Sequence, residues 1–194
     1  MTRPVRPEIH ITEEHHAAIV GHARRKLLGH YEPSETPERK AFGLLGGRSD
    51  GHRFRVTALF PLRVNLRGSG HYQDVMDEAV AHYAIPSETP AEQRGWVADP
   101  AELLEAENTF DALESVMFGS YHTHRVPWPD DPLRDTCTEL DTRLAENSGM
   151  WSFIVSMVDP EQPRLRAFYE GRNDREATIR ISPALSPHPK ETSR

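Results

Sequence analysis

Apolar residues along this 194-residue chain recur with the period of strands in some segments and with the period of helices in others. Strands and helices that alternate in this way predict an α/β fold. The predicted strands are 8–12, 42–46, 53–62, 116–124, 151–158 and 164–169, and the predicted helices are 13–29, 73–83, 100–113 and 132–148.

Residues that cap helices or form turns mark several of these boundaries. Thr12 is a predicted N-cap for the first helix, and Asp50-Gly51 is typical of the turn between two hairpin strands. Asp99 precedes Pro100, a pairing that favours a helix beginning at the proline. These local signals make the order of elements predictable, although they do not specify how the strands pair.

Composition and charge exclude several classes of protein. The formal net charge of -7, with no basic run to offset it, argues against a nucleic-acid partner. The chain has no apolar stretch of membrane-spanning length and no signal-peptide pattern, so it is predicted to be cytoplasmic and to have no membrane partner. Cys137 is the single cysteine, which excludes an internal disulfide, and it is expected to be a small buried residue.

Two histidines and one aspartate form the strongest chemical signal. His122 and His124 are two positions apart on a predicted strand, so their side chains project from the same face. Asp131 and Pro132 are the predicted N-cap and first residue of the next helix, which places Asp135 in its first turn. Two nitrogen ligands and one oxygen ligand leave a position free for water, as in catalytic zinc sites. The sequence therefore predicts Zn²⁺ bound by His122, His124 and Asp135, with non-haem iron as the alternative metal.

The same segment resembles the JAMM metalloproteases, also called the JAB/MPN+ family. Their signature is His, Ser or Thr, His, seven residues, Ser, two residues and Asp, and residues 119–124 with Asp135 fit its histidine and aspartate positions. Residues 37–47 are similar to a second block of the family, and the likeness extends over residues 8–169.

The resemblance implies one metalloprotease domain over residues 7–172. Its expected fold is an MPN/JAB-like mixed β-sheet flanked by helices, similar to that of cytidine deaminases. The C-terminal segment 173–194 follows this domain, and it is rich in Pro, Ser and charged residues from 182 onward. Residues 182–194 are therefore predicted to be disordered.

Two positions depart from the family's pattern. The family's general-base glutamate corresponds to Lys40, and the nearest carboxylate, Glu38, shares a face with Lys40 if the backbone there is extended. Glu38 is therefore the predicted general base. Lys40 is either a solvated strand-end lysine or a group whose pKa is lowered for catalysis by a nearby cation. Pro132 occupies the position of the family's oxyanion-binding serine, and a proline donates no hydrogen bond; Thr136 is the nearest hydroxyl.

Three features near the predicted site have two interpretations each. Residues 65–98 can carry substrate recognition or can be a surface excursion. Trp128 can form a wall of a substrate groove or can fill the loop against the core. Arg125 can pair with a substrate carboxylate or with Asp130 or Asp131.

Two functions follow from these observations. The first is a JAMM-type zinc peptidase or isopeptidase, in which water activated at the metal attacks a carbonyl and Glu38 carries the proton. The resemblance implies a substrate with an extended C-terminal tail, from a ubiquitin-like or sulfur-carrier protein or a small peptide conjugate. The second is a catalytically impaired MPN-like scaffold for protein association, which Lys40 and Pro132 support. The oligomeric state does not follow from the sequence.

Overall fold

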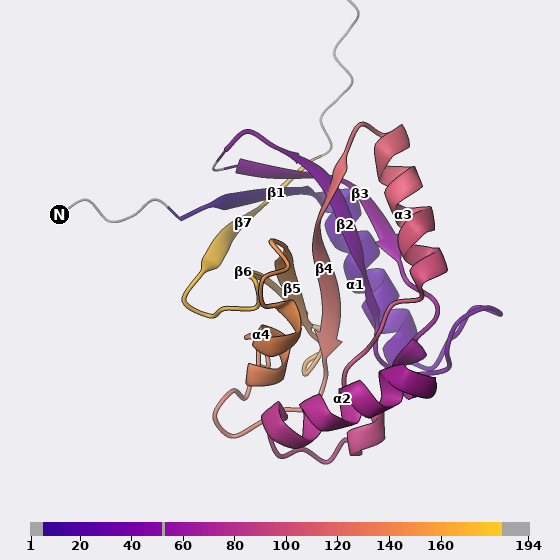
Figure 1. Cartoon of the computed structure of the whole chain (residues 1–194). Coiled ribbons are helices and arrows are strands. Elements are labelled where there is room, and N and C mark those ends of the chain that lie inside the picture. Colours follow the sequence, from indigo (N-terminus) through magenta and orange to yellow (C-terminus); the bar gives the residue numbers. More distant parts are fainter. Residues whose placement is uncertain (1–5, 52, 184–194) are drawn as a thin grey trace, which may run out of the picture.

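The computed structural model describes residues 6–51 and 53–183. Within these residues, seven strands form one sheet that closes as a barrel, and the helices lie around it (Figure 1). A bilayer-spanning helix, which needs a long apolar stretch, is not found among the described residues. The strands are β1 (Glu8–Thr12), β2 (Phe42–Ser49), β3 (Arg53–Pro61), β4 (Val116–His124), β5 (Trp151–Ser156), β6 (Arg164–Tyr169) and β7 (Glu176–Ser182). The helices are α1 (Glu13–Leu27), α2 (Gly70–Tyr83), α3 (Pro100–Ala112) and α4 (Glu139–Ala145), with short 3₁₀ turns at Leu66–Gly68 and Ala91–Gln93.

The strand order around the barrel is β1-β3-β2-β4-β5-β6-β7. β2 pairs antiparallel with β3 and β4, β4 pairs parallel with β5, and β5, β6 and β7 continue as antiparallel neighbours. β1 closes the barrel because it pairs in parallel with β3 on one side and with β7 on the other.

The predicted fold class, an MPN/JAB-like mixed sheet flanked by helices, is therefore wrong. The predicted strands end at residue 169, and without β7 the sheet lacks the strand that joins β6 to β1. The predicted domain end at residue 172 leaves out the same strand, which extends the folded domain to Ser182. Most of the predicted disordered tail, residues 184–194, lies outside the described residues.

Helices cover both faces of the sheet around β2. Ile19 and Ala23 of α1 join the main core, to which β2 contributes Leu45. Phe42 is an odd number of residues away on the same strand, so it faces the other side, where it packs with Phe110 of α3. Side chains on both faces of β2 are thus buried, which explains its continuous apolar sequence.

Several local predictions are confirmed. Thr12 caps α1, and Asp99 caps α3 with Pro100 at the start of the helix; each cap accepts a backbone N–H of the first turn. The β2–β3 hairpin turns at Gly51, whose φ of +95° is unstrained only for glycine. Cys137 is buried, and burial raises the pKa of its thiol.

The helix after the histidine strand begins at Glu139 and not, as predicted, at Pro132. In the intervening loop, Asp131 accepts hydrogen bonds from the backbone N–H and hydroxyl of Thr136, so it closes a local turn and caps no helix. Thr138 caps α4 instead, through a capping box in which it exchanges hydrogen bonds with Asp141.

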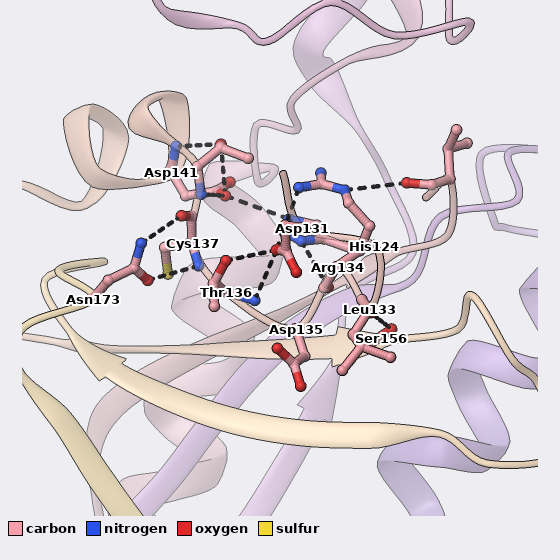
Figure 2. A network of polar contacts seen from close by, with 12 residues as sticks. His124, Asp131, Leu133, Arg134, Asp135, Thr136, Cys137, Asp141, Ser156 and Asn173 are labelled. Atoms are coloured by element: carbon pink, nitrogen blue, oxygen red, sulfur yellow. Dashed lines mark hydrogen bonds and ion pairs between the residues drawn. The ribbon is translucent and has the colours of Figure 1, made fainter. Parts of the chain in front are cut away.

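Contacts with α2 and with the β6–β7 turn position α4. Leu140 packs against α2, and the Thr142 hydroxyl donates to the Gly171 carbonyl at 2.7 Å. Just before the helix, the backbone N–H and carbonyl of Cys137 bond to the Asn173 side chain at 3.0 and 2.9 Å (Figure 2). A Cβ on Gly171 would lie 2.9 Å from the Asp141 carbonyl oxygen, so α4 packs directly on this turn.

Gly171→Ala is expected to destabilise the protein more than Gly149→Ala. The two glycines have similar φ values of +65° and +68°, so each substitution incurs about 1–2 kcal/mol of backbone strain. A Cβ at residue 149 would meet only the Tyr169 hydroxyl, 4.0 Å away, whereas one at residue 171 would collide with α4. We expect Gly171→Ala to lower the free energy of unfolding by about 1–3 kcal/mol more than Gly149→Ala in urea denaturation. Equal losses would contradict the close packing of α4 on this turn.

Candidate metal site

β4 presents two histidines on the side of the sheet opposite the main core. Tyr121 faces the core, where its hydroxyl lies 2.7 Å from Nδ1 of His22 on α1. Because side chains alternate along a strand, His122 and His124 face the other side. Both are buried, and their Nε2 atoms lie 3.1 Å apart. The prediction that one strand brings these two imidazoles together is confirmed.

Asp141 of α4 completes the group. Its Oδ1 lies 3.1 Å from His122 Nε2, and its Oδ2 lies 3.4 Å from His124 Nε2. In a tetrahedral zinc site with bonds of about 2.0–2.1 Å, neighbouring ligand atoms are about 3.3 Å apart. Among the described residues, these are the His, Cys, Asp or Glu side chains with the spacing of a metal site. The donor set and its distances therefore fit zinc.

Neighbouring groups orient two of the three candidate ligands. His124 Nδ1 lies 3.2 Å from the Arg134 carbonyl oxygen, which favours the tautomer that donates from Nδ1 and leaves the Nε2 lone pair for a metal. The backbone N–H and hydroxyl of Thr138 both donate to Asp141 Oδ2, at 2.6 and 2.7 Å (Figure 2). Arg134 has a φ of +49°, an unusual value for a residue other than glycine, and this conformation belongs to the loop that turns its carbonyl toward His124.

The ionisation states also suit a cation. Burial lowers the pKa of the His124 imidazole, although Asp141 beside it acts in the opposite direction. Burial alone would raise the pKa of the Asp141 carboxyl, but the two imidazoles outweigh burial and hold that pKa well below its usual value. A neutral imidazole and a carboxylate anion are the forms that coordinate metals.

Asp135, the predicted third ligand, lies elsewhere. Its carboxylate accepts hydrogen bonds from Arg164 and Arg166 of β6, both at 2.8 Å, and Figure 2 shows it pointing away from His124 and Asp141. Burial acts to raise the pKa of Asp135, but the two guanidinium groups outweigh it and lower that pKa. The assignment of Asp135 as a ligand is therefore replaced by Asp141. The physical reason is the later start of α4, which leaves Asp135 in a loop that passes over β6.

Glu38, the predicted general base, does not border the candidate site directly. Its two oxygens accept from Asn65 Nδ2 at 2.9 and 3.1 Å, and its Oε2 lies 3.1 Å from Lys40 Nζ. Lys40 Nζ also donates to the carbonyl oxygens of Gln93 and Gly95. Lys40 is therefore no solvated lysine, because it ties residues 93–95 to the segment before β2. The role of Glu38 as a base stays a prediction.

The candidate ligands border a pocket of about 150 Å³. Its walls come from the segment 84–96, from residues 122–128 and from α4 with the loop before it. Trp128 lines this pocket, as does Trp96, which stacks on Phe42 with ring centroids 5.2 Å apart. The segment 84–96 is thus a wall of the site, which favours recognition over a simple surface excursion.

No hydroxyl from the predicted oxyanion position reaches the pocket. Pro132 is not among the residues that line it, and the hydroxyl of Thr136 donates to Asp131 at 2.6 Å. Lys40 and Arg125 are two of the donor side chains that line the pocket. Folding therefore does not supply the JAMM glutamate at position 40 or the JAMM serine at position 132.

The sequence contains a signal for Asp141 that competes with the predicted helix start at Pro132. Thr138-Glu139-Leu140-Asp141 has a capping residue followed three positions later by an acid, which is the pattern of a capping box. This pattern predicts a helix that starts at Glu139 and has Asp141 in its first turn, as the structure shows.

Comparisons with known proteins bear on the fold alone. No protein-family description and no curated protein matches the chain. The solution structure of protein DSY2949 from Desulfitobacterium hafniense is similar, with a TM-score of 0.57 and 24% sequence identity over 93% of this chain and 97% of that chain. A solution structure of a protein from Salinibacter ruber aligns over 93% of each chain with 21% identity and a TM-score of 0.44. The first likeness supports the barrel described above and leaves the chemistry of the site to its own geometry.

Zinc affinity distinguishes Asp141 from Asp135 as the third ligand. We expect Asp141→Asn to weaken zinc binding at least about 100-fold while its remaining oxygen still accepts from Thr138. Asp135→Asn should leave zinc affinity nearly unchanged and lower the free energy of unfolding by about 1–3 kcal/mol, because it weakens two charge-assisted hydrogen bonds. Competition with a chromophoric chelator and urea denaturation measure the two effects. Zinc lost from Asp135→Asn and retained by Asp141→Asn would restore the assignment made from the sequence.

The Thr138 hydroxyl is expected to contribute to metal affinity without touching the metal. Thr138→Ala removes one of the hydrogen bonds that orient the Asp141 carboxylate, so zinc should bind about 10- to 100-fold more weakly. Thr136→Ala is the matched control, because that hydroxyl donates to Asp131 and not to Asp141. The same chelator competition checks both variants, and equal affinities for the two would argue against the orienting role.

Proposed function

We propose that the chain is a zinc-dependent hydrolase of peptide or isopeptide bonds, the chemistry of the JAMM metalloproteases. The observation that supports this most is the triangle of ligand atoms from His122, His124 and Asp141, with distances of 3.1 to 3.4 Å, at the wall of a pocket. Three protein ligands are typical of catalytic zinc sites, whereas structural zinc sites have four. A zinc ion held there would acidify water and polarise a substrate carbonyl.

The protein's own residues would hold the site in one geometry. The Arg134 carbonyl fixes the tautomer of His124, and the N–H and hydroxyl of Thr138 fix the Asp141 carboxylate. Such orienting contacts raise metal affinity because the ligands need not be ordered at the moment of binding. Residues 84–96 and Trp128 wall the pocket, so they limit the access of bulk water to a bound substrate.

Hydrolysis also requires a group that accepts a proton from water and returns one to the leaving amine. Lys40 lines the pocket, and its Nζ lies 3.1 Å from Glu38 Oε2. Burial lowers the pKa of Lys40, although Glu38 opposes this effect. In this proposal Glu38 is the base, and Lys40, which stands between Glu38 and the pocket, would pass the proton to it.

The proposed substrate is a peptide or an extended C-terminal tail. The pocket has apolar side chains beside the candidate ligands, which suits the side chains and aliphatic parts of a peptide. The apolar lining residues include Ile85, Trp96, Trp128, Leu140 and Leu144. A tail from a ubiquitin-like or sulfur-carrier protein and a small peptide conjugate both fit this description.

A catalytically impaired scaffold for protein association is the second candidate. The observation in its favour is that Asp141 is the one carboxylate among the described residues that line the pocket. With Asp141 on the metal, no acid in contact with the pocket remains to act as a base. The two candidates differ in whether zinc-loaded protein turns over any substrate.

Hydrolysis of short fluorogenic peptide and isopeptide conjugates by zinc-loaded protein tests the proposal. We expect turnover in the wild type, and in Glu38→Gln we expect full zinc content with kcat lowered about 10²- to 10⁴-fold. Glu107→Gln, an exposed position on α3, is the control for a change of one charge. Zinc-loaded wild type with no turnover would favour the scaffold, and full activity in Glu38→Gln would remove Glu38 as the base.

A further inference from the structure

The pocket beside the candidate metal site carries an excess of positive charge. Asp141 is the lining carboxylate among the described residues, whereas four lining side chains are cationic. The four are Lys40, Arg94, Arg125 and Arg134. A concave site with this balance attracts anions, and a bound divalent cation would increase the attraction.

Three of these four cationic side chains are hydrogen-bonded to other protein groups. Arg94 donates three hydrogen bonds to backbone carbonyls of residues 85–89. Arg134 donates from Nε to the Val126 carbonyl at 3.1 Å, and Lys40 bonds to Gln93, Gly95 and Glu38. These side chains hold the pocket walls in place and have little capacity left for a ligand.

Arg125 differs from the other three. Within residues 6–51 and 53–183 its guanidinium makes no hydrogen bond or ion pair, although the side chain is half-buried at the pocket wall. Asp130 and Asp131, the two partners that the sequence suggests, do not pair with Arg125. Asp131 accepts a hydrogen bond from Thr136, and Asp130 is exposed. Arg125 also lies close enough to Lys40 for their charges to repel, and this repulsion helps to lower the pKa of Lys40.

A guanidinium in this setting fits one kind of ligand group. Its planar N–H groups match the two oxygens of a carboxylate, and such bidentate pairs are among the strongest hydrogen bonds in proteins. Arg125 lines the same pocket as the three candidate ligands, so a ligand group that it binds lies near the candidate metal. A pocket of about 150 Å³ has room for an amino acid or the end of a short peptide.

We propose that Arg125 is a specificity-determining residue that binds a carboxylate of the substrate beside the scissile amide. The substrate class is then a peptide or conjugate whose leaving group is an amino acid or short acidic peptide. The carboxylate is either the C-terminal one or that of an Asp or Glu side chain. The position of the scissile amide rests on the proposed function. The choice of an acid rests on the Arg125 guanidinium, which is unpaired among the described residues.

Calorimetric binding to zinc-loaded protein tests the inference without requiring turnover. The probes are N-acetyl-Gly-Gly, its C-terminal amide, and N-acetyl-Gly-Asp amide, which carries only a side-chain carboxylate. We expect the wild type to bind at least one of the two acids about 10- to 100-fold more tightly than the neutral amide. The acid that binds more tightly identifies the source of the carboxylate.

Two variants separate Arg125 from the general positive charge. Arg125→Met keeps the aliphatic part of the side chain, and we expect the preference for an acid to fall below about threefold. Arg143→Met is the matched control, because Arg143 lies on α4, is exposed and does not line the pocket. It should keep the wild-type preference, and circular dichroism checks that both variants are folded.

Several results would overturn the inference. These are equal binding of acids and amide by the wild type, no detectable binding of either acid, and an unchanged preference in Arg125→Met. Tighter binding of phenyl phosphate than of both acids would overturn the choice of a carboxylate. Failure of the proposed function looks different: the preference for an acid would persist and depend on Arg125, while no substrate would be hydrolysed.

Discussion

The reciprocal hydrogen bonds between Thr138 and Asp141 decide where α4 begins, and the candidate metal site depends on that start. The same carboxylate that accepts from the helix cap faces His122 and His124 across 3.1 to 3.4 Å. A cap shared with a site in this way couples local helix stability to the geometry of the ligands, because loss of either hydrogen bond frees the carboxylate to rotate. The capping box therefore acts as an orienting contact for the site as well as a helix-start signal.

The barrel supplies the fixed half of the arrangement. β4 lies between β2 and β5, with hydrogen bonds to both, and Tyr121 on its inner side meets His22 of α1. The two imidazoles on the other side thus belong to a strand that is held by two neighbours and by a buried polar contact. The other half is the set of loops around the pocket, whose backbone carbonyls accept hydrogen bonds from Lys40, Arg94 and Arg134. Arg125 remains as the cation that these internal contacts do not use.

Local structure was predictable where one residue determines it. The caps at Thr12 and Asp99 and the turn at Gly51 were found because each satisfies or permits a specific backbone conformation. The histidine pair was found because alternation along a strand is a geometric necessity. These signals are read within a few residues of one another, so no knowledge of the tertiary fold is required.

Features that depend on distant parts of the chain were not predictable in the same way. The barrel closes through the parallel pairing of β1 with β7, whose partner residues Glu8 and Thr178 come from the two ends of the domain's sequence. Asp135 fits a linear motif, but its carboxylate is buried against two arginines of β6, and nothing near it in the sequence indicates that contact. Asp141 had a local signal that competed with Asp131-Pro132, and packing on α2 and Gly171 favours the later helix start.

An anomalous-difference map from crystals of zinc-loaded protein tests the central claim most directly. The account predicts one peak about 2.0–2.2 Å from Nε2 of His122, Nε2 of His124 and a carboxylate oxygen of Asp141. Under the same account, Asp135 stays bound to Arg164 and Arg166. A peak beside Asp135, or no peak near the two imidazoles, would contradict it.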